Sequence, residues 1–210
     1  MKSMRVLISL MLAAMIVLGC NEITTRNSES DFVVEPLVSF ASTIDDSNDW
    51  EDYKLWLKSE ESRHYVSKEL GGLRYSALLE PPLYSYLKSE GVNAKKNFDD
   101  SQYSNQIRIE FEIFALKGSG ELAKYDVSGR DEYNERVNYY SFKFQDDVYL
   151  VLDSDTVACG MAVWEREFNA SPRIKHQLLF TKPEGKKSIK DIQLVFYDRI
   201  FDNGIVKLKF

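Results

Sequence analysis

The chain has 210 residues and carries 27 basic against 33 acidic side chains, which gives a formal net charge of −6 at pH 7. An acidic surface repels phosphate backbones, so this composition argues against a nucleic-acid partner. The length is that of one domain with a sizeable hydrophobic core.

The first predicted element is a signal peptide over residues 1–19. Lys2 and Arg5 precede Val6–Leu18, a stretch of 13 residues in which only Ser9 is polar. A positively charged segment followed by a short apolar one is typical of a secretory signal. The apolar stretch is too short for a membrane-spanning helix, which takes roughly 20 residues.

The end of this segment, Val17-Leu18-Gly19-Cys20, resembles the lipobox of bacterial lipoproteins: an aliphatic residue, a variable position, a small residue and the cysteine. The resemblance implies that Cys20 becomes the first residue of the mature chain. Cys20 would then carry a diacylglycerol thioether and an N-acyl chain, and no other cofactor is predicted. Several acyl chains hold a protein firmly on a membrane, because each buried methylene contributes about 0.8 kcal/mol. The alternative is a plain secretory signal with an incidental cysteine.

The residues after the cysteine bear on location. Asn21 and Glu22 follow it, and no aspartate stands directly after it, so the likeness to enterobacterial lipoproteins implies the outer membrane. The periplasmic and the surface face are both open. Residues 20–36 are polar and lack periodicity, as in a flexible tether, and roughly 15 such residues reach about 20 Å. Residues 37–210 are expected to form a single globular domain.

A helical segment is predicted over about 45–90, and its first helix over 48–58. Trp50, Tyr53 and Leu57 recur there at helical spacing. We expect this segment to pack on the outside of one sheet.

The rest of that segment is less regular. Residues 59–70 are predicted as a second helix that ends at Gly71-Gly72, since glycine commonly ends helices. A strand at 73–79 and a short helix at 83–89 follow.

From residue 106 the apolar periodicity changes to two, which is typical of half-buried strands. The clearest strand is 106–115. Further strands are predicted at 122–127, 137–145, 148–152, 156–166, 174–181, 191–198 and 205–210, with polar loops at 91–105 and 128–136. Short strands separated by turns indicate a mainly β, α+β fold: an antiparallel β-sandwich-like domain of eight or nine strands.

Four acids bracket one predicted strand: Asp146, Asp147, Asp153 and Asp155. Asp153-Ser154-Asp155 has the spacing that begins a calcium loop. The glycine and the distal glutamate of that loop are missing, so acidic hairpin turns and no metal site are predicted.

Cys159 lies in the apolar run Val157–Met161, where a thiol ordinarily packs as a small hydrophobic group. It is the only cysteine left once Cys20 is lipidated, so the mature chain cannot form an internal disulfide. A catalytic thiol needs a nearby histidine, and the chain has only His64 and His176. We therefore predict a structural role for Cys159.

Four aromatic residues are weak candidates for a ligand platform: Tyr139, Tyr149, Trp164 and Tyr197. On one outer sheet face they would stack sugar rings. The alternative is that they lie beneath the N-terminal helices, which is favoured because exposed aromatic patches are rare on monomers.

No nucleophile elbow, zinc spacing, phosphate-binding glycine loop or dinucleotide fingerprint occurs in the sequence. The sequence therefore predicts a lipid-anchored cell-envelope protein that is not an enzyme. It would be a binding or assembly subunit that contacts other envelope proteins. The alternative is a lipoprotein that binds or hydrolyses glycans with the aromatic face and two acids.

Overall fold

The computed structural model describes Ile44 and residues 47–168, 171–185 and 189–210. The predicted signal peptide, the lipidation residue Cys20 and the tether at 20–36 lie outside the described residues and stay predictions. Within the described ranges no helix is long and apolar enough to cross a membrane.

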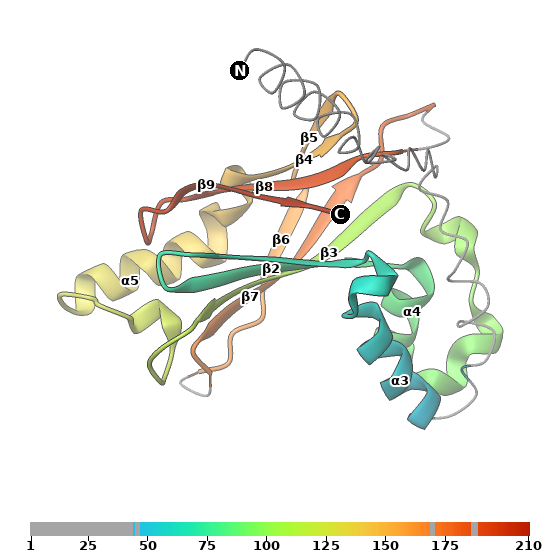
Figure 1. Ribbon diagram of the computed structural model, residues 1–210, viewed down its shortest axis with the longest axis horizontal. Helices are drawn as coiled ribbons and strands as arrows, with labels where there is room; N and C mark the ends of the chain where they lie inside the picture. Colours follow the sequence, from blue (N-terminus) through green and yellow to red (C-terminus); the bar gives the residue numbers. More distant parts are fainter. Residues whose placement is uncertain (1–43, 45–46, 169–170, 186–188) are drawn as a thin grey trace, which may run out of the picture. The chain divides into compact units, whose positions relative to one another are not determined.

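Nine strands of the described chain form two antiparallel sheets that face each other (Figure 1). In spatial order, the five-stranded sheet contains β1 (Tyr65–Leu70), β2 (Leu73–Glu80), β3 (Gln106–Ala115), β7 (Arg173–Thr181) and β6 (Met161–Trp164). The four-stranded sheet contains β5 (Asp155–Ala158), β4 (Val148–Leu152), β8 (Ile192–Asp198) and β9 (Gly204–Lys209). The predicted fold class, mainly β and sandwich-like with eight or nine antiparallel strands, is confirmed.

The main core fills the space between the two sheets. Along β3 the odd-numbered residues are buried and the others only partly or not at all, which is the alternation of a half-buried strand. Phe111 of β3 meets Phe196 of β8 with ring centroids 5.3 Å apart. Both side chains are buried, and each buried side chain of this kind contributes roughly 1.5–3 kcal/mol to folding. Apolar contact therefore holds the two sheets together.

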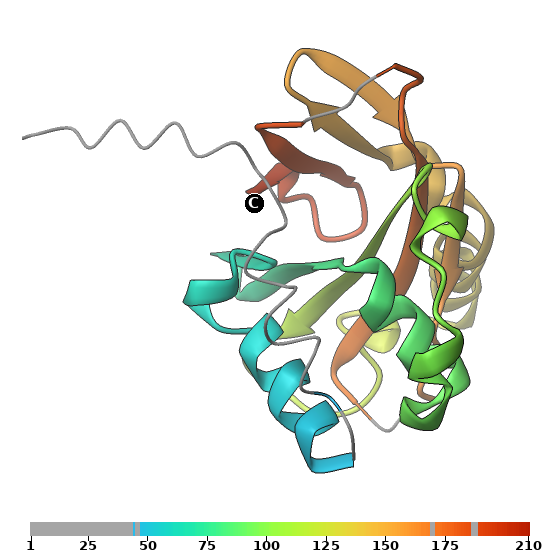
Figure 2. The same cartoon turned by 90° about the vertical axis from the view of Figure 1, so that its right-hand side faces the viewer.

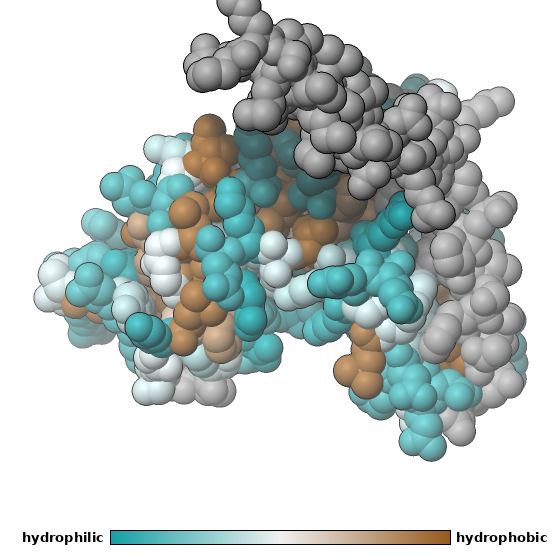
Figure 3. Space-filling model, in the orientation of Figure 1, coloured by the Kyte–Doolittle hydropathy of each residue, from teal (hydrophilic) through white to brown (hydrophobic). Residues whose placement is uncertain are grey.

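Two helices, α3 (Ser47–Leu57) and α4 (Pro82–Glu90), lie on the outer side of the five-stranded sheet (Figure 1, Figure 2). Tyr53 and Leu57 of α3 are buried in a second cluster with Leu78 of β2. The neighbouring residues of β2 face the main core, so both faces of this strand are buried. The surface of α3 in Figure 3 is hydrophilic apart from isolated apolar groups, as expected where one face of a helix meets solvent.

Residues 59–70 are not the second helix that the sequence predicts. After a 3₁₀ turn, η1 (Glu60–Ser62), the chain forms β1, which pairs with β2 through Gly71-Gly72. Both glycines have positive φ, 59° and 77°. Two such residues in succession form the tight turn of a β-hairpin, whereas a helix end takes only one. The predicted helical segment at 45–90 thus contains two strands.

A second correction concerns residues 122–147, which form helical turns where the sequence predicts strands at 122–127 and 137–145 and a loop at 128–136. The observed elements are η4 (Leu122–Lys124), α5 (Arg130–Asn138), the π-helical turn η5 (Tyr139–Lys143) and η6 (Phe144–Asp147). Figure 1 shows α5 at the end of the sandwich away from α3 and α4.

Local polar contacts explain why this segment is helical. Glu132 accepts a hydrogen bond from the Ser128 N–H at 2.7 Å and pairs with Arg136, one turn later, at 2.6 Å. The apolar residues that suggested a strand include Tyr140 and Phe144, which are four residues apart and both buried. That spacing also fits one face of a helix.

The predicted strand at 156–166 is two strands in different sheets, β5 and β6. The Cys159 N–H donates to the Val148 oxygen of the four-stranded sheet at 3.3 Å, and the Gly160 N–H donates to the Leu179 oxygen of the five-stranded sheet at 2.9 Å. The chain therefore crosses between sheets at these two residues, which apolar periodicity alone does not reveal.

Candidate functional site

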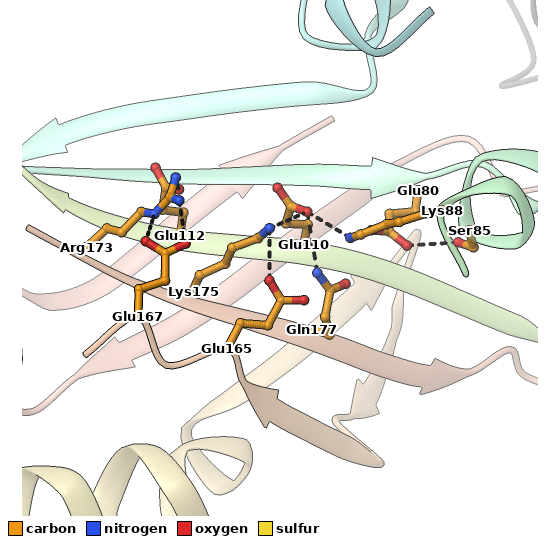
Figure 4. Close-up of polar contacts among 10 residues, drawn as sticks. All are labelled: Glu80, Ser85, Lys88, Glu110, Glu112, Glu165, Glu167, Arg173, Lys175 and Gln177. Atoms are coloured by element: carbon orange, nitrogen blue, oxygen red, sulfur yellow. Dashed lines mark hydrogen bonds and ion pairs between the residues drawn. The ribbon is translucent and has the colours of Figure 1, made fainter. Parts of the chain in front are cut away.

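A row of ionised side chains covers part of the outer face of the five-stranded sheet (Figure 4). We call it the outer-face ladder. Its residues come from β2, α4, β3, β7 and the segment after β6; they are Glu80, Lys88, Glu110, Glu112, Glu165, Glu167, Arg173 and Lys175.

Glu110 is the centre of the ladder. Its Oε2 lies 2.9 Å from the Lys88 Nζ and 3.0 Å from the Lys175 Nζ. Lys88 also reaches Glu80 at 2.7 Å, and Lys175 reaches Glu165 at 2.9 Å. Each lysine therefore joins two carboxylates that come from different elements.

The charges of the ladder hold one another ionised. Burial alone would raise the pKa of Glu110, but Lys88 and Lys175 lower it to about 2. Burial would lower the pKa of Lys88, but Glu80 and Glu110 raise it above its usual value. A carboxylate with so low a pKa cannot supply a proton as a general acid near neutral pH.

A shallow cleft of about 280 Å³ lies beside the ladder. Glu80, Lys88 and Glu165 line it together with apolar groups from Met161 and Leu179. Met161 is 48% exposed, so the cleft presents an apolar group to solvent as well as fixed charges. Such a surface is suited to recognition, and the ion pairs fix its shape.

A buried polar cluster ties the two sheets together at the turn end of β1 and β2. The Tyr75 hydroxyl donates to Asp198, and the Asn203 Nδ2 donates to the Tyr75 hydroxyl at 2.8 Å. Asp198 also accepts the main-chain N–H groups of Ile200 and Phe201 at 3.2 and 3.0 Å. Burial and the bond to Asp198 raise the pKa of Tyr75. This cluster is a structural contact between the β1–β2 and β8–β9 hairpins.

β1 of one sheet and β9 of the other lie side by side, and we call the line between them the seam. Its end remote from the β1–β2 turn is open. β1 and β9 are the last strands of their sheets, and no described strand pairs with the outer edge of either. A cavity of about 570 Å³ lies between them. We call it the edge groove; it is lined by Lys58, Glu60, Tyr65, Val66, Ser67, Lys68, Lys207, Leu208 and Lys209.

The strand register shows which main-chain groups face the edge groove. In an antiparallel pair, hydrogen-bonded residues alternate with residues whose N–H and C=O point away from the partner. The Leu79 N–H donates to the His64 oxygen, so Tyr65 and Ser67 direct their main-chain groups away from β2. By the same alternation from the Phe210 bond to Ile192, Lys207 and Lys209 direct theirs away from β8.

The four aromatic candidates do not share one face. Tyr139 is buried and donates to Asp147 at 3.0 Å. Trp164 lies on the core side of β6 with its ring 5.7 Å from Tyr140. Tyr149 and Tyr197 lie on the outer side of the four-stranded sheet, and Tyr197 is 43% exposed. Neither a platform of all four nor a common site beneath α3 is formed.

The acidic residues on either side of β4 bind other groups of the protein. Asp147 pairs with the Arg199 guanidinium at 2.6 Å. Asp153 has φ 55° and accepts the main-chain N–H groups of Lys190 and Asp191 at 2.9 and 3.0 Å. In the described part of the chain, no three His, Cys, Asp or Glu residues are placed to hold a metal ion.

The two histidines are bound to main-chain carbonyl groups. His64 contacts the Leu79 oxygen at 2.9 Å. His176 stacks on Phe144 at a centroid distance of 3.8 Å, and burial lowers its pKa to about 4. Burial also raises the pKa of the Cys159 thiol, which is opposite to what a nucleophilic cysteine requires.

The ladder and the edge groove were not predicted from the sequence. On β3, charged residues alternate with the apolar ones, and this pattern marks an outward face. Which cations they meet depends on the register with β7: Glu110 lies opposite Gln177, so Lys175, two residues along β7, reaches it diagonally. The groove depends on the order of strands in both sheets, which periodicity does not give.

Comparison with known proteins gave no match: no family model matches the chain, no curated protein is similar to it, and no solved structure matches its fold. No residue role is therefore transferred from a relative, and function has to be inferred from the geometry of the described residues.

Proposed function

We propose that this protein is a lipid-anchored bacterial cell-envelope protein, at the outer membrane, that binds another envelope protein and does not catalyse a reaction. The binding role rests on one observation, the edge groove, in which two sheet edges lie beside each other and no strand of the described residues pairs with either. A free sheet edge presents a row of main-chain donors and acceptors, which is a template for pairing with another chain. Strand addition of this kind is a common mode of peptide recognition.

The chemistry of the other polar groups supports binding over catalysis. In the ladder, Glu110 is held as a carboxylate by Lys88 and Lys175. The Cys159 thiol has a raised pKa, and His176 is fully buried. These groups stabilise the fold or shape its surface, and their states do not suit proton transfer or nucleophilic attack near neutral pH.

The membrane part of the proposal rests on the lipobox-like sequence at Cys20. Changing Cys20 to Ala should move the protein from the membrane fraction to the soluble periplasmic fraction, because the acyl chains supply the attachment. Cys159→Ala leaves the lipobox intact and should stay with the membranes. If the Cys20 variant also stays with the membranes, the lipoprotein assignment is wrong.

The binding part is tested by cross-linking in whole cells. A photo-reactive amino acid at Lys207, in the edge groove, should capture an envelope protein. The same amino acid at Thr156, an exposed residue on the far edge of β5, is the matched control. Capture of protein at Thr156 alone would overturn the proposed function. So would a rise in melting temperature with soluble glycan if neither position captures protein.

A further inference from the structure

Resting on the proposed function, we infer that the edge groove accepts an extended acidic segment of the partner protein as an added β-strand. This inference is carried by two strand edges with which no described strand pairs, lying beside a group of lysines on an acidic chain.

The main chain provides donors and acceptors on both walls of the groove. Tyr65 and Ser67 of β1 face it from one side, and Lys207 and Lys209 of β9 face it from the other. A strand in this position pairs with one edge or both at the ordinary spacing of about 4.8 Å between strands. No side chain of the partner is needed for these bonds, so they set the extended conformation of the ligand.

The groove is closed at one end and open at the other. At the turn end, Gly71 lies so close to Asn203 that an added Cβ would be 2.1 Å from the Asn203 Oδ1. Apart from Lys58 and Glu60, which precede β1, the cavity is lined by the strand ends remote from these turns. A segment of about four residues, roughly 13 Å long, can therefore pair before the seam closes.

Charge selects the chemistry of that segment. Four of the lining residues are lysines, Lys58, Lys68, Lys207 and Lys209, and one is a glutamate, Glu60. All four lysines are exposed, on a chain whose net charge is −6. Lys209 pairs with Asp191 at 2.8 Å, where both side chains are more than half exposed. Such a rim attracts carboxylates and repels a basic strand.

The test for strand addition uses proline, which removes one main-chain donor. Ser67→Pro deletes an N–H that faces the groove and donates no hydrogen bond to β2, and such a proline is tolerated on a sheet edge. Thr156→Pro is the matched control, because the Thr156 N–H faces the outer edge of β5, away from β4 and outside the groove.

The probe is a labelled ten-residue peptide in which Glu alternates with Val, bound to the full-length lipidated protein in detergent micelles. Ser67→Pro should weaken binding about fivefold, the effect of one lost hydrogen bond, whereas Thr156→Pro should leave it unchanged. Equal binding by wild type and Ser67→Pro would overturn strand addition.

The charge requirement is tested with the same assay. The double variant Lys68→Glu, Lys207→Glu should weaken binding at least tenfold at low salt, and the difference should shrink at high salt because exposed charges are screened. Lys117→Glu, on the exposed turn after β3, is the matched control. A peptide with Lys in place of Glu should bind the wild-type protein at least tenfold more weakly; equal binding by both peptides would overturn the acidic assignment.

Cross-links from Lys207 in cells separate the two proposals. An acidic, extended segment of another protein supports the inference. Cross-links only to residues 20–43 of the same chain, or only to a second copy of it, would overturn the inference that another protein supplies the added strand. If another protein is captured but Ser67→Pro neither reduces its capture nor weakens the probe, the inference fails and the proposed function stands. If no protein is captured, the proposed function itself fails.

Discussion

The seam between β1 and β9 has two ends that treat their polar groups differently. At the turn end, Tyr75, Asp198 and Asn203 are joined by hydrogen bonds, and Asp198 is 1% exposed. At the other end the main-chain groups of Ser67 and Lys207 face the open edge groove. At the turn end the polar groups bind one another within the chain, and we call it the sealed end. At the open end the main-chain polar groups point outward, where another chain can reach them.

This difference separates residues that hold the fold from residues available for binding. Buried polar groups cost free energy unless they are paired, so the sealed end must be complete within the chain. Exposed main-chain groups on a strand edge bind water, so they cost little free energy when no other chain is bound. Changes at the sealed end should therefore affect stability, and changes at the open end should affect binding with little loss of stability.

The largest effect is expected from Asp198→Ala. This change leaves the Tyr75 hydroxyl and the N–H groups of Ile200 and Phe201 without their acceptor, which should lower the free energy of unfolding by about 3–5 kcal/mol. Urea denaturation followed by circular dichroism measures it. Asp198→Asn keeps an acceptor oxygen and should cost about half as much. If both variants cost under about 1 kcal/mol, the sealed end does not hold the sheets together.

A smaller effect is expected from Glu110→Gln in the outer-face ladder. The folded pKa of Glu110 is about 2, below its usual 4.5. Its contribution is therefore complete above pH 4.5 and lost as the pH falls towards 2, and it amounts to roughly 3 kcal/mol. The variant should be less stable than wild type at pH 7, and the difference should vanish near pH 2.

Glu51→Gln is the matched control for that change. Glu51 pairs with Lys54, but its side chain is 64% exposed, so this pair should contribute under about 0.5 kcal/mol. Equal losses for Glu51→Gln and Glu110→Gln at pH 7 would mean that the ladder is an ordinary surface ion-pair array.

The contrast between strands and helices explains how much of this fold the sequence predicts. β3 was predicted with its observed bounds, because one face is core and the other charged along all its length. The strand predicted at 137–145 was wrong, because buried aromatic residues at mixed spacing fit both a strand and a helical turn. The prediction that Gly71-Gly72 ends a helix was wrong. Only the two positive φ angles show a hairpin turn, and these depend on the pairing between β1 and β2.

The candidate sites were less predictable than the fold. Lys88 and Glu110 are 22 residues apart in sequence and meet because α4 packs on the outer side of the sheet to which Glu110 points. Tyr139 and Trp164 were expected to share a site with Tyr149 and Tyr197 because all four fall in predicted strands. Tyr139 instead lies in a helical turn, and Trp164 lies on the core side of β6. The edge groove joins β1 to β9, the first and last strands, so no local pattern describes it.

Gly71→Ala should reduce the free energy of unfolding by about 2 kcal/mol. The new Cβ would clash with the Asn203 Oδ1 at 2.1 Å, and φ is 59°, so both the contact and the backbone are strained. Gly72→Ala has φ 77° and nothing within 4 Å of its Cβ, so it should lose only about 1 kcal/mol. The difference between the two denaturation midpoints measures the closeness of the hairpins. Equal losses would mean that they do not pack tightly.

The smallest effect on stability should come from the open end of the seam. Lys207 is exposed, so Lys207→Glu should change the free energy of unfolding by less than about 0.5 kcal/mol. Ser67→Pro should cost no more than about 1 kcal/mol, because the lost N–H faces the groove and not β2. Thermal unfolding of each variant beside wild type measures both changes. A loss of 2 kcal/mol or more in either would show that the edge groove supports the fold, and its two edges would then be sealed like the turn end.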